Sequence, residues 1–166
     1  NRLDTTAVLP AASARSMGVL GYVARASGVE VDARADQPFV DLGPGFRVVT
    51  AVSGDVRARF DVRVGEVAVS AGLVADLAAR IGESGVQPAS SGSAGPGAGL
   101  GVVEAWRGTL VHRVEVDAAG HLARVKVVDP SFSTWPALGV ALADTIVPDF
   151  PLANKSFNMS YAGNDL

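Results

Sequence analysis

The sequence contains no cysteine, and this absence excludes several kinds of chemistry at once. Disulfide bonds, thiolate zinc sites, iron-sulfur ligation and a cysteine nucleophile all require the missing thiol. The two histidines, His112 and His121, lie within a predicted hairpin and do not have the spacing of paired ligands on a helix. We therefore expect no metal ion to be bound by this chain.

Lysine and net positive charge are also scarce, with a formal net charge of -3 and an isoelectric point near 5.3. The chain therefore lacks the basic surface that binds nucleic acid or an anionic membrane. No apolar run approaches the roughly 18 residues of a membrane-spanning helix. Nothing near Asn1 resembles a signal peptide, and we interpret the chain as a fragment of a longer protein.

Hydrophobic residues, by contrast, make up 48% of the chain, and 19 glycines come in addition. Surplus apolar surface indicates contact with another subunit. An equally good explanation is a GC-rich genome, which raises the content of Ala, Gly, Val and Arg. The length suffices for one hydrophobic core, so we expect one domain.

Residues 1–82 are predicted to form a helical portion with an irregular crossover. The spacing of apolar residues predicts a helix over 11–28, which Gly18 and Gly21 weaken. These glycines alternatively mark the close approach of another backbone. Residues 29–54, which include two prolines, are predicted to form the crossover with short strands.

Residues 55–83 carry two competing patterns. Alternating valines and arginines at the start favour a strand, whereas an apolar stripe along the whole segment favours a helix. The length favours the helix, which Asp55 or Ser53 can cap.

Residues 83–99 are predicted to be a flexible loop rich in Gly, Ser and Pro. Residues 100–166 are predicted to carry a β-hairpin, with strands over 102–116 and 122–128, followed by C-terminal helices. The three segments form one domain fragment.

The first C-terminal helix is predicted over 132–146, with Pro136 in its first turn. The tail, residues 147–166, is predicted to be loop plus one short helix that Asp149 can cap. The expected fold class is α+β, mainly helical with a small antiparallel hairpin sheet.

Two short segments suggest familiar chemistry but do not carry it. Ser131 and Thr134 lie near Asp129, but no GxSxG elbow surrounds them and no histidine is placed to activate them. The glycine-rich segment 95–101 lacks the Lys-Ser/Thr of a phosphate-binding loop. We expect neither a hydrolase triad nor a nucleotide phosphate site.

The antiparallel hairpin is expected to carry Asp129 back toward Glu104 and Arg107. An arginine-carboxylate pair is expected there, and a structural ion pair that orders a loop is the commoner form of such a pair. The alternative is a desolvated pair that orients a ligand. Glu104, Arg107 and Asp129 are therefore the candidate cavity residues.

Several motifs occur in one order along the chain. They read GYVARASGVEVDARADQPF, SGDVRARFDVRVGEVAVS, VVEAWRGTLVH, DPSFSTWPAL and IVPDFPLANKSFNMSYAGNDL. Together they resemble the C-terminal part of a nickel-iron hydrogenase-like large subunit of the formate hydrogenlyase and energy-converting hydrogenase-related group. That subunit is similar in turn to the quinone-site large subunit (49 kDa type) of respiratory complex I, an NADH dehydrogenase.

The resemblance gives two of these motifs a meaning. Hydrogenases of this kind place an arginine over the metal centre, matched here by Arg107, with Trp106 where proline is usual. Their Asp-Pro-Cys-x-x-Cys motif supplies two thiolates, and the matching positions here are Ser131 and Thr134. Because hydroxyls are poor nickel ligands, the resemblance implies that the nickel-iron site is lost.

Four further polar residues fall within the matching motifs. They are Arg25, Asp32, Arg34 and Asp55. For polar residues near helix ends, capping and ion pairing explain their presence at least as well as a role in binding.

The resemblance implies part of a membrane-associated oxidoreductase subunit, peripheral on the cytoplasmic face. In that role electrons pass from an iron-sulfur small subunit to a quinone or another acceptor, and a membrane-embedded subunit is a further partner. The iron-sulfur cluster belongs to the partner, so this fragment is expected to bind no cofactor, to be inactive alone and to self-associate. The alternative is a non-catalytic structural docking subunit.

Overall fold

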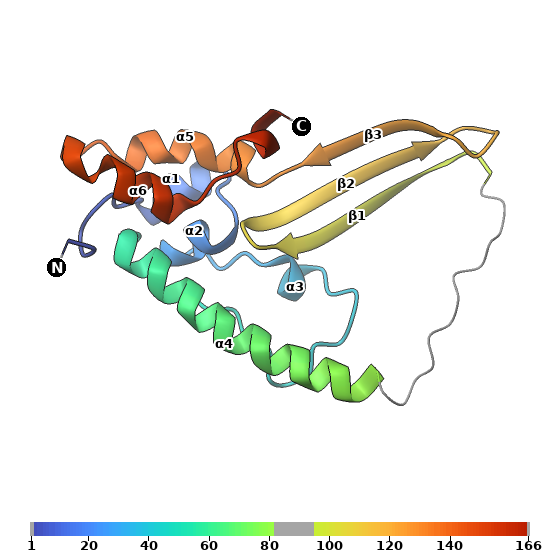
Figure 1. Cartoon of the computed structure of the whole chain (residues 1–166), viewed down its shortest axis with the longest axis horizontal. Helices are drawn as coiled ribbons and strands as arrows, with labels where there is room; N and C mark the ends of the chain where they lie inside the picture. The colour runs from blue at the N-terminus through green and yellow to red at the C-terminus, as the bar shows by residue number, and fades with distance from the viewer. Residues whose placement is uncertain (1, 82–94, 166) are drawn as a thin grey trace.

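The computed structural model describes residues 2–81 and 95–165, which form an α+β fold of helices and a three-stranded antiparallel sheet. Both ends of the chain contribute helices to one body, and the sheet extends away from that body (Figure 1). The elements are α1 (Ala11–Ser16), α2 (Gly21–Ala26), α3 (Ala33–Asp36), α4 (Val56–Ile81), β1 (Gly97–Ala105), β2 (Gly108–Val116), β3 (Leu122–Val128), α5 (Ser131–Ala141), η1 (Val147–Asp149), α6 (Phe150–Phe157) and η2 (Ala162–Asp165). The expected fold class is confirmed.

The single helix predicted over 11–28 is wrong, because the chain turns between α1 and α2. Gly18 has a φ of 66°, a left-handed conformation that ends α1. Gly21 has a φ of 68° and lies directly against the turn between β1 and β2, where a side chain would overlap the carbonyl group of Arg107. The alternative prediction, close approach of another backbone, is confirmed at Gly21.

The crossover over residues 29–54 contains the short helix α3 and no strand, so the predicted short strands are wrong. Asp32 caps α3 by accepting a hydrogen bond from the Arg34 backbone N–H (2.9 Å). The Ala51 N–H donates to the Arg25 carbonyl (3.0 Å), which ties the end of the crossover to α2. The backbone of this segment is therefore satisfied by caps and neighbouring loops rather than by a sheet.

The long helix predicted over 55–83 is confirmed as α4. Asp55 caps it by accepting from the Ala58 N–H (2.8 Å), and the Ser53 hydroxyl donates to the same carboxylate oxygen (3.0 Å). Val62 lies on the buried face, whereas Phe60 is 57% exposed. The helix is as predicted, but the predicted stripe is not its buried face. Val62, Val69 and Leu73 are buried against the core, whereas Phe60, Val67, Val74 and Ile81 of the stripe are exposed.

The sheet differs from the predicted hairpin by one strand. Segment 102–116 is not a single strand, because the chain reverses at Trp106 and Arg107 between β1 and β2. The β2–β3 hairpin is as predicted, and β1 begins at Gly97, so residues 97–99 of the expected loop belong to the sheet. Residues 83–94 of that loop lie outside the described residues.

The C-terminal segment closes the helical body. Helix α5 begins at Ser131, and Pro136 lies inside it rather than in its first turn. The tail contains one short helix, α6, as predicted, flanked by two 3-10 turns. Asp149 stands at the start of α6 without a side-chain capping bond and forms an ion pair with Arg2 instead.

The core joins the two ends of the chain through α2, α4, α5 and α6. Tyr22 and Phe157 are each 1% exposed, and Arg59 is fully buried beside them. The Arg59 guanidinium donates to the carbonyls of Gly54 (2.7 Å) and Ala7 (2.9 Å) and lies 4.4 Å from the Phe157 ring centre. Burial of this cation lowers the pKa of Arg59 to about 10.

Candidate functional site

The three predicted cavity residues lie at one end of the sheet. Glu104 is on β1 opposite Thr109, Arg107 is in the turn that follows, and Asp129 comes directly after β3. The antiparallel pairing therefore brings them into one region, as predicted. Each of them, however, has its own partners.

Arg107 is held by the backbone on both sides. Its carbonyl lies against Gly21, and Gly108 packs against the same glycine, so the turn is fixed on the start of α2. Its Nε donates a hydrogen bond to the carbonyl of Asn158, the left-handed residue that ends α6. The guanidinium is thus placed between the sheet and the C-terminal helices.

Asp129 serves the start of α5. Its Oδ1 accepts a hydrogen bond from the Ser131 backbone N–H (2.7 Å), and its carboxyl group packs directly against Gly163. Within residues 2–81 and 95–165, Asp129 and Arg107 form no ion pair, so the pair expected between them is wrong. The Asp129 carboxylate instead accepts a local hydrogen bond from the Ser131 backbone N–H.

Ser131 and Thr134 are both buried, and both hydroxyls are engaged. Ser131 accepts a hydrogen bond from the Ser160 N–H (2.9 Å), and Thr134 donates to the Pro130 carbonyl (2.9 Å). The gap that they line with Arg107 has no room for a water molecule. Hard hydroxyl ligands that are already bonded, in a space this small, do not fit a nickel-iron centre.

Glu104 belongs to a different group, the Arg25 cluster, which consists of Arg25, Asp32, Arg34, Glu66 and Glu104. Arg25 is 1% exposed and lies at its centre. Its terminal nitrogens approach Glu66 (2.6 Å), Glu104 (2.8 Å) and Asp32 (3.3 Å). The cluster joins α2 and α3, which are neighbours in the sequence, to the distant elements α4 and β1.

Two carboxylates of this cluster are well supplied with donors. Glu104 also accepts from the Ala33 N–H (3.1 Å) and the Thr109 hydroxyl (3.0 Å). Asp32 accepts a two-pronged pair from the Arg34 guanidinium, at 2.9 and 2.6 Å. Burial alone would raise the pKa of Asp32, but the hydrogen bonds from Arg34 and the nearby positive charges lower it overall.

The sequence did not single out Glu66. Its one signal is its place on α4, four residues after Val62 and three before Val69, which are both buried. The sequence predicts capping or ion pairing for Arg25 and Asp32, and the two residues form an ion pair with each other. Glu104 lies at the same end of the sheet as Arg107, but its ion pair is with Arg25.

A cavity of about 380 Å³ opens beside the Arg25 cluster. Its walls are formed by the cluster residues Arg25, Arg34, Glu66 and Glu104, with Val67, Ser70, Ala105 and Trp106. The volume is in the range of small-molecule sites. The cavity is therefore lined both by charged groups and by the indole ring of Trp106.

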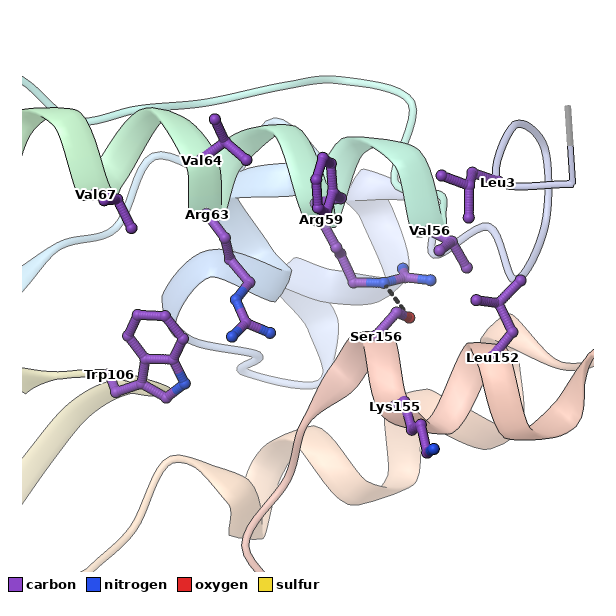
Figure 2. A pocket seen from close by; sticks show the side chains of 11 residues that line it. Leu3, Val56, Arg59, Arg63, Val64, Val67, Trp106, Leu152, Lys155 and Ser156 are labelled. Atoms are coloured by element: carbon purple, nitrogen blue, oxygen red, sulfur yellow. Dashed lines mark hydrogen bonds between the residues drawn. The ribbon is translucent and has the colours of Figure 1, made fainter.

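A second cavity, an apolar groove of about 430 Å³, lies on the other side of Trp106 between α4 and α6 (Figure 2). Arg63 reaches from α4 to within 4.4 Å of the Trp106 ring centre. Arg63 also lies 5.2 Å from the Tyr22 ring centre, and burial raises the Tyr22 pKa to about 12 although Arg63 opposes this. Of the described residues that line the groove, three are basic and none is acidic.

No helix within the described residues is both long enough and apolar enough to traverse a lipid bilayer. Within the same residues, no three metal-binding side chains are grouped to hold an ion. Around the sequence-predicted residues the geometry offers a buried charge cluster, a closed gap at the positions matched to thiolates and the two cavities that Trp106 lines.

Comparison with known proteins places this architecture in a family. Residues 1–94 match the family described as "Respiratory-chain NADH dehydrogenase, 49 Kd subunit". The chain is 30% identical over 155 residues to the carbon monoxide-induced hydrogenase of Rhodospirillum rubrum, covering 91% of this chain and 42% of that protein. It is 33% identical over 159 residues to a subunit of the F(420)H(2) dehydrogenase of Methanosarcina mazei, covering 86% of this chain and 40% of the relative.

The fold agrees with a solved respiratory assembly. A chain of the membrane-bound sulfane sulfur reductase, an archaeal respiratory membrane complex, superimposes with a TM-score of 0.87 at 25% identity. The match covers 99% of this chain and 47% of the solved one.

The fold and the motifs are those of part of a large subunit of the hydrogenase and NADH dehydrogenase type, as the resemblance predicted. The chain belongs to the family of the 49 kDa subunit of respiratory-chain NADH dehydrogenase. It spans less than half the length of the relatives described above.

Proposed function

We propose that this chain is part of the large subunit of a membrane-associated oxidoreductase complex. In this complex electrons arrive from an iron-sulfur small subunit, and a quinone-like or other small molecule accepts them. The observation that carries the proposal is the state of the former thiolate positions. The hydroxyl groups of Ser131 and Thr134 are both engaged in hydrogen bonds and line a closed gap. The chain is therefore suited to a branch of the family without nickel-iron chemistry.

The residues proposed to face the acceptor are Glu104, Arg107 and Asp129, at the end of the sheet. Arg107 has only its Nε occupied by a hydrogen bond among the described residues, so its two terminal nitrogens are available to a carbonyl or hydroxyl oxygen of the acceptor. Because the gap beside it is closed, the acceptor cavity is completed by parts of the subunit beyond this chain. The cluster of the iron-sulfur partner needs thiolates that this chain does not contain.

The proposed location is peripheral, on the cytoplasmic face of the membrane, between the iron-sulfur subunit and a membrane-embedded subunit. The names of the relatives support a place in respiratory assemblies, since they include a subunit of the NADH-quinone oxidoreductase of Anaeromyxobacter, 32% identical over 161 residues. The exposed face of α4, with Phe60 and Val67, supplies apolar surface for such contacts.

A non-catalytic docking subunit is the second candidate. The observation that favours it is that Asp129 and the two hydroxyls are all engaged in local structure, which leaves little polar chemistry free in the closed gap. The two candidates differ in what they require of Arg107.

The test is the metal content and the acceptor reduction of the complete subunit, co-purified with its small-subunit neighbour from membranes. We expect iron without nickel, and loss of acceptor reduction in Arg107→Ala but not in the control Arg113→Ala, which removes an exposed arginine of β2. Unchanged activity in Arg107→Ala would favour the docking subunit. Stoichiometric nickel would overturn the conclusion drawn from Ser131 and Thr134.

A further inference from the structure

The Arg25 cluster has one carboxylate more than it has guanidinium groups. Asp32, Glu66 and Glu104 face Arg25 and Arg34 in a largely buried setting. An uncompensated negative charge is costly away from water, and the usual remedy is protonation of one group. The question is which of the three carboxylates takes the proton.

The supply of donors separates the three. Glu104 receives hydrogen bonds from Arg25, Ala33 and Thr109, and Asp32 receives three from Arg34. These bonds favour the ionised form of both groups.

Glu66 has much less support. A terminal nitrogen of Arg25, 2.6 Å from Oε1, is the one donor group that approaches Glu66 among the described residues, and by strict geometry even this buried oxygen is left without a well-formed hydrogen bond. The Arg25 Nε is likewise buried without a partner. Glu66 is thus the carboxylate that gains most by becoming a neutral acid.

Glu66 also has a path to water. Its side chain is 14% exposed, against 2% for Glu104 and 0% for Asp32. It lines the cavity of about 380 Å³ beside the cluster, together with Ser70 one turn further along α4. Water in that cavity can deliver a proton to Glu66 and remove it.

We propose that Glu66 is a proton-binding site, which takes up and releases one proton through the cavity beside the Arg25 cluster. The neutral acid leaves two carboxylates against two guanidinium groups, so the cluster is balanced in charge. The ionised form leaves one carboxylate in excess in a largely buried place, which weakens the packing of α4 on the cluster. One proton therefore sets the strength of the contact between α4 and the cluster.

The electrostatics of the neighbouring residues agree with this assignment. Burial raises the pKa of Glu66, and the charge and close donor contact of Arg25, with the charge of Arg34, only partly oppose this effect, while Asp32 adds to it. The pKa of Asp32 is shifted in the opposite direction. The charged groups facing Glu66 come from α2, α3 with its capping residue, and β1.

The proposal goes beyond the proposed electron transfer and does not depend on it. The test is infrared spectroscopy of the complete subunit in its complex, recorded as difference spectra between successive pH values. We expect the carbonyl band of one protonated, buried carboxylic acid, which disappears as the pH rises. The band should be absent from Glu66→Gln and present in the control Glu115→Gln, which removes a carboxylate of β2 outside the cluster.

A second variant keeps the test decisive if Glu66→Gln fails to assemble. Glu66→Asp retains an acid at the same place on α4, so its band should persist and titrate at a shifted pH. A wild-type complex without such a band, or a band that survives in Glu66→Gln, would overturn the proposal. Neither result bears on metal content or acceptor reduction, so the two proposals fail separately.

Discussion

Among single residues, the buried arginines show two ways of keeping a guanidinium away from water. Arg59 is satisfied by neutral carbonyl oxygens and an aromatic ring, and its pKa falls to about 10. Arg25 is instead surrounded by carboxylates at its terminal nitrogens, while its Nε has no partner within the described residues. Replacing one carboxylate of such a group therefore has an effect that depends on how many other donors it serves.

Glu104→Gln tests this dependence. We expect it to lower the free energy of unfolding by roughly 2–4 kcal/mol, because three donors lose an ionised acceptor in a buried place. Urea unfolding of the purified subunit measures the change. Glu115→Gln, on an exposed pair with Arg113, is the control and should change little. Equal effects would show that burial of the pair is not what matters.

The pH dependence of stability provides another prediction about individual side chains. Asp32, whose pKa is lowered, contributes stability above its ordinary pKa that is lost as the pH falls through its folded-state pKa. Glu66, whose pKa is raised, contributes stability at low pH that is lost as the pH rises through its folded-state pKa.

We therefore expect Asp32→Asn to flatten the acid limb of a plot of unfolding free energy against pH. Glu66→Gln should flatten the decline above the ordinary glutamate pKa. Curves that merely shift downward, with the wild-type shape, would contradict these assignments.

Among the helices and strands, the turn between β1 and β2 is attached to the start of α2 by the backbone alone. Gly21 and Gly108 both have positive φ and touch each other. This contact fixes the position of Arg107 between the sheet and α6. Glycine is required here by space as well as by conformation.

A series of three glycine substitutions separates these two causes. Gly21→Ala should destabilise by about 3 kcal/mol or more, because positive φ and overlap with Arg107 act together. At Gly18 an added methyl group would have no atom within 4 Å, so Gly18→Ala should lower the free energy of unfolding by only about 1 kcal/mol, the cost of a positive φ. Gly72 also faces open space but lies inside α4, so Gly72→Ala should raise the free energy of unfolding by up to about 1 kcal/mol, because alanine favours the helix more than glycine does. Thermal unfolding gives the order, and a Gly21→Ala loss no larger than that of Gly18→Ala would show that the close contact adds nothing.

Across the molecule as a whole, much apolar surface remains uncovered. The sheet extends from the helical body with most of β1 and β3 exposed (Figure 1). The apolar groove and the outer face of α4 add Phe60, Val64 and Val67, each more than half exposed. Large apolar patches of this kind belong to interfaces.

We expect the isolated chain to self-associate through α4, since burying these side chains removes them from water. Light scattering over a wide concentration range measures the effect. Val67→Glu should shift the chain toward monomer by placing a charge in the apolar contact, whereas Ala119→Glu, in the exposed β2–β3 turn, should not. A wild-type chain that stays monomeric throughout would contradict the expectation.

The parts of the fold that could be predicted from the residues alone are those in which the signal is local. The apolar stripe and Asp55 located α4, and the valine alternation around a glycine turn located the β2–β3 hairpin. The missing cysteines, with Ser131 and Thr134 at the motif positions, establish that this chain supplies no thiolate. Caps, periodicity and composition act over a few residues, which is why they can be read directly.

The partners of the charged residues, by contrast, were settled only by folding. Arg25, Glu66 and Glu104 come from three elements, and no spacing in the sequence relates them. The break between α1 and α2 and the turn at Arg107 likewise depend on each other, because Gly21 meets Gly108 only in the folded chain. Such contacts are fixed by packing between distant segments, where space and desolvation select among the many pairings that local sequence allows.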